Sequence, residues 1–176
     1  MKFKRSNDLE LIDLGPSYYT NDEYEDCLIQ LGRIGKYLGG NRASFKQFSK
    51  HINPEKILDV GCGGGSFTLL LGKYFPQSEV IGIDLSYQAI FFAKKQLGHS
   101  LVKNVQFQVL DLNQIEKTHG KIDIITATLV CHHLKDAELI EFLKQSYRIA
   151  CKSVIINDLH RNWLAYFGFA LIAKGF

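Results

Sequence analysis

A short segment from residue 57 to residue 66 joins a carboxylate to a glycine-rich turn, and it is the first candidate for ligand binding. Asp59 closes an apolar run and is followed by Gly61, Cys62 and Gly63. Glycines in such a turn let the backbone approach a ligand closely, and the helix that follows presents unpaired N–H groups. A carboxylate two residues before the first glycine suits a cationic ligand but sits poorly beside a pyrophosphate. The alternative is a glycine turn that binds no ligand.

Two further acids follow the next two apolar runs, and together they outline an adenosine site. Asp84, with Leu85 after it, lies about 20 residues beyond the turn, where a carboxylate can accept hydrogen bonds from ribose hydroxyls. Asp111 follows the third run and could accept from the exocyclic amine of adenine, while Leu112 packs on the ring. Each acid has an alternative role as a helix N-cap, for which Ser86 is also suited.

The segment after the fourth apolar run carries two adjacent histidines. Thr128 and Leu129 close this run and are placed with the ligand-binding residues, and His132 and His133 follow. Imidazole titrates near neutral pH, so His132 or His133 could take a proton from a phenol or enol. The alternative is that they only cap or pack and that the reaction needs positioning alone. We predict no metal site, because adjacent histidine side chains diverge and no third ligand lies at a recognisable spacing.

Five apolar runs and the segments between them must position these residues. The runs are short and rich in Val and Ile, which is typical of strands buried on both faces: Lys56–Val60, Glu79–Asp84, Asn104–Leu110, Lys121–Ala127 and Lys152–Asn157. Apolar periodicity predicts helices over residues 66–74, 86–97 and 136–149, with a weaker connector over 112–119. The alternation predicts a Rossmann-like parallel α/β sheet with helices on both faces. Such a sheet brings the ends of its strands to one crevice.

The segments before and after this core are predicted to cover the crevice. Residues 1–53 form a helical lid segment and residues 54–176 the core of a single domain, with helices expected from residue 21 or 22 to about 38 and from 42 to 51. The tail from Trp163 to Phe169 is the second predicted cover. Tyr18, Tyr19 and Tyr37 could touch a ligand, although packing is their alternative role.

The successive motifs resemble those of class I S-adenosylmethionine-dependent methyltransferases. They are, in order, Asp59-x-Gly61-x-Gly63, Asp84, Asp111-Leu112 and Ile122-Asp123-Ile124-Ile125. The resemblance covers nearly the whole chain, and it is closest to methyltransferase-domain proteins of quinone-biosynthesis and secondary-metabolism type. It implies S-adenosyl-L-methionine as cofactor, with the methionine part at the glycine turn, the ribose at the second acid and the adenine at the third. It also implies methyl transfer to oxygen or carbon of a small, aromatic or polyketide-like acceptor.

The end of the sequence departs from this family. Class I methyltransferases usually add two strands after the fifth, whereas 19 residues follow Asn157. We therefore expect a sheet without its last strands, an exposed fifth-strand edge that would allow a homodimer, and an intact chain that continues past Phe176. The alternative functions are a cofactor-binding module without turnover and a nicotinamide oxidoreductase. The second is disfavoured by Asp59, and by Ser66 at the position of the third dinucleotide-binding glycine.

Composition narrows the class of protein further. The net charge of +3 is small and the basic residues are scattered, so we expect no nucleic-acid partner. The N-terminus lacks the apolar region of a secretory signal, and the eleven-residue apolar run Trp163–Ala173 is too short to span a bilayer. The four cysteines form no CxxC pair and fit reduced thiols in a cytoplasmic protein: Cys27, Cys62, Cys131 and Cys151.

Overall fold

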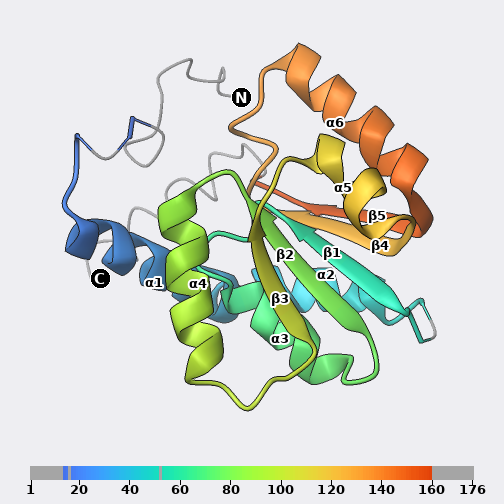
Figure 1. Ribbon diagram of the computed structural model, residues 1–176, viewed down its shortest axis with the longest axis horizontal. Coiled ribbons are helices and arrows are strands. Elements are labelled where there is room, and N and C mark those ends of the chain that lie inside the picture. Colours follow the sequence, from blue (N-terminus) through green and yellow to red (C-terminus); the bar gives the residue numbers. More distant parts are fainter. Residues whose placement is uncertain (1–13, 16, 52, 160–176) are drawn as a thin grey trace.

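Five parallel strands form one sheet in the computed structural model, which describes residues 14–15, 17–51 and 53–159 (Figure 1). The strands are β1 (Lys56–Val60), β2 (Glu79–Asp84), β3 (Val105–Val109), β4 (Ile122–Thr128) and β5 (Ala150–Asn157). Their order across the sheet is β3-β2-β1-β4-β5. The chain moves outward from β1 to β3 and then returns to add β4 on the other side of β1, so the order reverses between β1 and β4. In open α/β sheets, ligands bind beyond the carboxyl ends of the strands at this reversal.

Four helices cover the two faces of the sheet (Figure 1). Helices α3 (Ser66–Tyr74) and α4 (Tyr87–Gly98) lie on one face, and α5 (Leu112–His119) and α6 (Asp136–Ile149) lie on the other. The side chains of β1 alternate between two cores: Ile57 packs with Phe67 and Ile90, whereas Leu58 packs with Ile115. A strand covered on both faces needs apolar residues at successive positions, which explains the continuous apolar runs.

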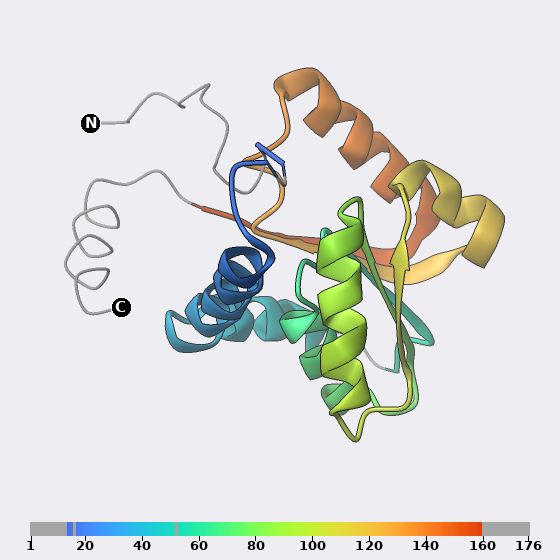
Figure 2. The same cartoon turned by 60° about the vertical axis from the view of Figure 1, so that its left-hand side comes forward.

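Helices α1 (Asn21–Tyr37) and α2 (Gly40–Phe48) precede the sheet in the sequence. They lie on the same side of the sheet as α3 and α4 (Figure 2). A capping box starts α1, because the Thr20 hydroxyl accepts from the Glu23 N–H and the Glu23 carboxylate accepts from the Thr20 N–H. Tyr24 of α1 packs against Phe92 of α4. Phe48 at the end of α2 is fully buried in the same core as the strands. Helices α1 and α2 are thereby fixed to the rest of the fold, with α1 next to the first helix of the core.

The predicted Rossmann-like sheet is confirmed, and β1 and β2 have their predicted bounds. The connector at 112–119 is a helix, α5, which begins at a capping box between Asp111 and Gln114. Helix α2 begins two residues earlier than predicted, because Gly39 adopts a left-handed conformation with φ of 85° at its N-cap. In the described part of the chain, no helix combines the length and the apolar character that crossing a membrane requires. The predicted covering tail, Trp163 to Phe169, lies outside the described residues.

Candidate active site

The glycine turn after β1 brings backbone, rather than side chains, to the crevice. Gly61, Gly63 and Gly65 have φ of 67°, 50° and 78°, a region that other residues rarely adopt. A Cβ at Gly61 would lie 2.5 Å from Val130, and a Cβ at Gly65 would lie 2.5 Å from Phe107. The turn therefore needs glycine for two reasons, its backbone conformation and the close approach of its neighbours. The result is a concave backbone surface that ends at the start of α3.

Asp59 comes two residues before the first glycine of this turn, and its side chain is almost fully buried. Its side chain accepts a hydrogen bond from the Thr68 hydroxyl of α3, with 2.6 Å between the oxygens. Burial raises the pKa of Asp59 to about 7, the charge of Asp84 adds to this, and the hydrogen bond from Thr68 opposes it. A cationic ligand next to Asp59 would favour the ionised carboxylate, so this position is suited to positive charge.

Asp84 ties the end of β2 to the glycine turn. Its Oδ2 accepts from the backbone N–H of Gly63 at 2.9 Å, and its Oδ1 accepts from the N–H of Ser86 at 2.8 Å. Ser86 then caps α4 through Ala89 and shares a hydrogen bond with the Tyr24 hydroxyl of α1. A carboxylate has about four acceptor positions, so two backbone donors leave capacity for ligand hydroxyls. Asp84 thus holds the turn in shape and remains able to bind a ligand.

A cavity of about 340 Å³ opens between the glycine turn, the end of β4 and helix α1. Its floor contains Asp59, the glycine turn and Thr128, and α1 supplies most of its apolar side. Gly32 lets α1 approach α3 closely, because a Cβ at this position would lie 3.0 Å from the Ser66 side chain. Large apolar side chains that line the cavity come from α1, from α3, from the loop after β4 and from the segment after β5: Leu28, Leu31, Ile34, Phe67, Leu129 and Leu159. The cavity therefore joins a polar backbone wall to an apolar one.

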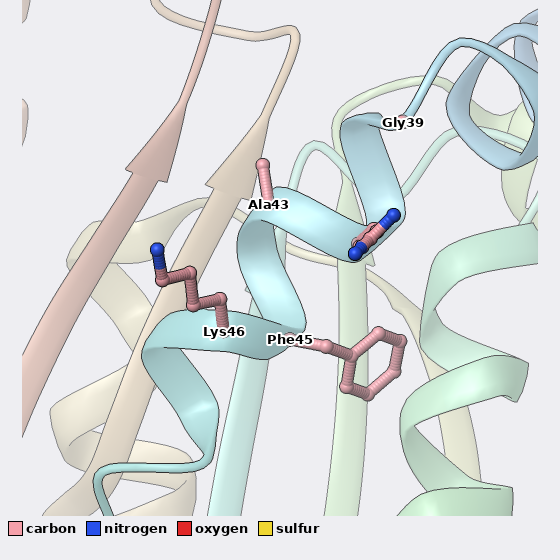
Figure 3. A pocket seen from close by; sticks show the side chains of 5 residues that line it. Gly39, Ala43, Phe45 and Lys46 are labelled. Carbon is pink, nitrogen blue, oxygen red and sulfur yellow. The ribbon is translucent and has the colours of Figure 1, made fainter.

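A larger hollow, of about 660 Å³, lies on α2 and is lined by Gly39, Arg42, Ala43, Phe45 and Lys46 (Figure 3). Figure 3 shows Ala43, Phe45 and Lys46 leaving the helix in different directions. Side chains that point away from one another do not surround a common ligand. We therefore take the smaller cavity at the end of β1 and β4 as the candidate site, since it contains the predicted glycine turn and both histidines.

The loop after β4 places His132 and His133 on the cavity wall, with their ring centroids 4.1 Å apart. Nδ1 of His132 lies 2.6 Å from Oδ1 of Asp158, and the backbone N–H of His132 donates to Oδ2 of the same carboxylate at 3.0 Å. Burial by itself raises the pKa of Asp158, but hydrogen bonds from His132 and Leu159 outweigh it, so the pKa lies below its ordinary value. Sequence reasoning did not assign a role to Asp158, although its place directly after β5 was a usable signal.

The structure brings together only some of the predicted binding residues. Six of them line the cavity: Asp59, Gly61, Cys62, Gly63, Thr128 and Leu129. The Thr128 hydroxyl is buried and has no hydrogen-bond partner within the described residues. Asp84 stands behind the turn, and Leu85 beside it is 72% exposed.

The remaining predicted residues lie at the start of α5. The Asp111 carboxylate caps this helix by accepting from the Asn113 N–H at 2.8 Å. Leu112 is buried in the core between the sheet and α5. Neither residue lines the cavity, and their part in ligand binding stays a prediction. Tyr18 and Tyr37 are exposed, and Tyr19 stacks on Tyr24 with 5.0 Å between ring centroids, so packing accounts for Tyr19 in this structure.

The fold, the glycine turn and the order of the acids define a class of protein. A family model described as a methyltransferase domain matches residues 57–152, which is more than half of the chain. The chain therefore belongs to the methyltransferase domain family, and the resemblance to class I methyltransferases is confirmed.

Three curated proteins show how similar the chain is to relatives of different kinds. The chain is 34% identical over 102 residues to the uncharacterized protein RP028 of Rickettsia prowazekii. It is 29% identical over 111 residues to the malonyl-[acyl-carrier protein] O-methyltransferase of Legionella pneumophila, and 30% identical over 122 residues to the mitochondrial ubiquinone biosynthesis O-methyltransferase of Mus musculus. These matches cover 58%, 63% and 66% of this chain but 36%, 37% and 32% of the relatives. The chain thus spans about a third of the length of these proteins.

Solved structures share the same fold. The plantazolicin methyltransferase BpumL, in complex with a desmethyl plantazolicin analogue and S-adenosylhomocysteine, has a TM-score of 0.62 at 22% identity, covering 88% of this chain and 58% of its own. A SAM-dependent methyltransferase from Aquifex aeolicus has a TM-score of 0.60 at 23% identity, covering 72% and 66%. At these identities the comparison supports the architecture alone.

Proposed function

We propose that this chain binds S-adenosylmethionine in the cavity at the ends of β1 and β4 and transfers its methyl group to a small acceptor. One observation carries the proposal: a turn of left-handed glycines, held by Asp84, lines the same cavity as the buried side chain of Asp59. When bound, S-adenosylmethionine supplies a methyl group on a positively charged sulfur. A buried acid beside a backbone cradle is the arrangement that such a ligand needs.

Each part of the cofactor has a candidate partner in the chain. The glycine turn would accommodate the methionine part, because Gly61, Gly63 and Gly64 line the cavity and leave their backbone exposed to it. Asp59 would balance the positive charge, and Asp84 would accept from the ribose hydroxyls with its remaining lone pairs. The buried and unpartnered Thr128 hydroxyl supplies a further polar contact at the cavity floor.

The acceptor half of the cavity favours a small molecule with an apolar body. Leu31 and Ile34 of α1, with Leu159 after β5, line this half, whereas His132 and His133 are its polar groups. The names of two relatives, the ubiquinone biosynthesis and malonyl-[acyl-carrier protein] O-methyltransferases, agree with transfer to oxygen. We therefore propose methyl transfer to oxygen or carbon of a small, aromatic or polyketide-like acceptor, by a cytoplasmic protein.

Calorimetric titration with S-adenosylmethionine, S-adenosylhomocysteine and NAD tests the cofactor. We expect micromolar binding of the first two and no binding of NAD. Asp84→Ala removes the acceptor for the Gly63 and Ser86 N–H groups and for the ribose, so affinity should fall at least about tenfold, which is about 1.4 kcal/mol.

Glu141→Ala is the matched control for that experiment. This change also removes a carboxylate, but Glu141 is exposed on α6, away from the cavity lining, and accepts a hydrogen bond from the Gln145 side chain. Its affinity for both ligands should equal that of the wild type. Binding of NAD alone, or of none of the three ligands, would contradict the proposal. Binding of S-adenosylmethionine without methyl transfer to any acceptor would instead support a module that lacks turnover.

A further inference from the structure

His132 is held by one carboxylate at two points. One carboxylate oxygen of Asp158 lies against the ring nitrogen Nδ1 of His132. The other oxygen accepts from the backbone N–H of His132. Both side chains are more than four-fifths buried, at 19% and 17% exposure, so the contact is shielded from solvent. A histidine that only caps or packs between a strand and a helix does not need two hydrogen bonds to one carboxylate. The arrangement fixes both the position of the loop after β4 and the orientation of the ring.

The contact also decides which ring nitrogen is basic. In neutral imidazole one nitrogen carries the proton and the other accepts, and a carboxylate next to Nδ1 favours the proton there. Nε2 is then the nitrogen that can take a further proton. The ionised state of Asp158 stabilises the positive charge that the ring acquires, as in other carboxylate–histidine pairs. The His132 ring lies on the wall of the cavity that also holds the glycine turn.

We propose that His132 is the base that takes a proton from the hydroxyl of the methyl acceptor, and that Asp158 is the residue that positions it. This inference rests on the proposed function. As the acceptor oxygen forms its bond to the methyl carbon, the carbon–sulfur bond breaks and its electron pair stays on sulfur. The hydroxyl proton passes to Nε2 of His132 and leaves to solvent after the product departs. The inference selects acceptors with an ionisable hydroxyl, such as phenols and enols.

The ionisable groups around His132 include His133, Asp158, Cys131 and Asp59. His133 lies next to it with its ring tilted by 37°, and Asp158 accepts from the ring. Burial, together with the charge of Asp158, raises the pKa of the Cys131 thiol, so this thiol stays neutral at ordinary pH. Asp59 lines the same cavity on the side of β1. Changes of charge at His132 and at Asp59 can therefore be separated by mutating each in turn.

The experiment measures proton transfer in a complex that cannot turn over. Protein saturated with S-adenosylhomocysteine is titrated with 4-nitrophenol, whose anion absorbs visible light. We expect the anion-to-neutral ratio of the bound probe to exceed that of the free probe at the same pH, and to fall by about tenfold in His132→Gln. Asp158→Asn keeps an oxygen for the backbone N–H but removes the charge, and should lower the ratio by about threefold or more. His99→Gln, at the exposed end of α4, is the matched histidine control.

A second measurement reports the positioning role without the probe. Nitrogen chemical shifts of the His132 ring should show the Nδ1-protonated form in the wild type and a mixture of forms in Asp158→Asn. A merely structural role of Asp158 would leave these shifts unchanged. S-adenosylhomocysteine binding by each variant shows that it is folded.

Three results would overturn the inference. One is a wild-type ratio in both His132→Gln and Asp158→Asn, and another is loss of the signal in His133→Gln with His132→Gln unaffected. The third is a wild-type protein that binds S-adenosylhomocysteine but not 4-nitrophenol. Failure of the wild type to bind S-adenosylhomocysteine would instead contradict the proposed function, so the two failures are distinguishable.

Discussion

The two walls of the cavity are built differently, one from backbone and the other from side chains. On the β1 side, consecutive residues make the turn, and Gly61 and Gly65 fit because they lack side chains. On the β4 side, the wall consists of side chains from α1, from the loop after β4 and from the end of β5. A wall made of backbone can bind a cofactor that all enzymes of one fold share. A wall made of side chains can differ from enzyme to enzyme and so suit different acceptors. The comparison predicts that the first wall tolerates very few substitutions.

Two glycines with the same conformation test the backbone wall. Gly65 caps α3 with φ of 78° and Gly39 caps α2 with φ of 85°. An alanine at Gly39 meets no atom within 4 Å, so only its backbone conformation is strained, at a cost of about 1–2 kcal/mol. An alanine at Gly65 would also meet Phe107 at 2.5 Å, and this overpacking raises the expected loss to about 2–5 kcal/mol.

Urea unfolding of Gly65→Ala and Gly39→Ala measures the difference between the two glycines. Equal losses of stability would mean that the turn relaxes around the added methyl group. In that case the close approach of Phe107 would not restrict the turn, and the contrast between the walls would rest on backbone conformation alone. Titration with S-adenosylmethionine on the same variants should show weaker binding for Gly65→Ala only.

Asp59 gives the backbone wall a pH dependence of its own. Its ordinary pKa is 3.8, and burial raises it to about 7 in the folded protein. Between these values the folded state holds a proton that the unfolded state has lost, so the free energy of unfolding falls as pH rises from about 4 to 7. Asp59→Asn stays neutral and should gain stability relative to the wild type across this window, on the order of a few kcal/mol.

Denaturant unfolding at intervals between pH 4 and pH 8 measures this difference. Thr68→Val is the partner experiment, because it removes the hydroxyl that donates to Asp59, so the pKa of Asp59 should rise further and the loss of stability should extend to higher pH. A difference between wild type and Asp59→Asn that stays constant with pH would contradict the raised pKa.

The same contrast explains what could be predicted from the sequence. The turn from Asp59 to Gly63 consists of consecutive residues, so its spacing alone indicated both the strand end and the glycine turn that follows it. The contact between His132 and Asp158 joins residues 26 apart in separate elements, and no local spacing records it. Leu112 follows an acid at a strand end, as a ring-packing residue would, and in the structure it is the first residue of the helix that Asp111 caps, with its side chain in the core, so its predicted contact with a ligand stays a prediction.

A substitution at Asn157, which lies at the end of β5 beside the side-chain wall, has the smallest expected effect on stability. Its amide donates to the Gly40 carbonyl at 2.8 Å and to the buried Ser44 hydroxyl at 3.0 Å, and so links the end of β5 to α2. Asn157→Ala leaves the two acceptors without this donor, and should cost about 1–2 kcal/mol of unfolding free energy. Cys151→Ala is the control, since this exposed β5 residue should change stability by less than about 0.5 kcal/mol.

Amide hydrogen exchange locates the effect of Asn157→Ala. Because the lost contacts lie between β5 and α2, exchange should accelerate in α2 and leave α5 unchanged. If α2 exchanges at the wild-type rate, then the packing of Phe48 in the core holds this helix without Asn157. The wall of side chains would then not depend on the hydrogen bonds that Asn157 makes to α2.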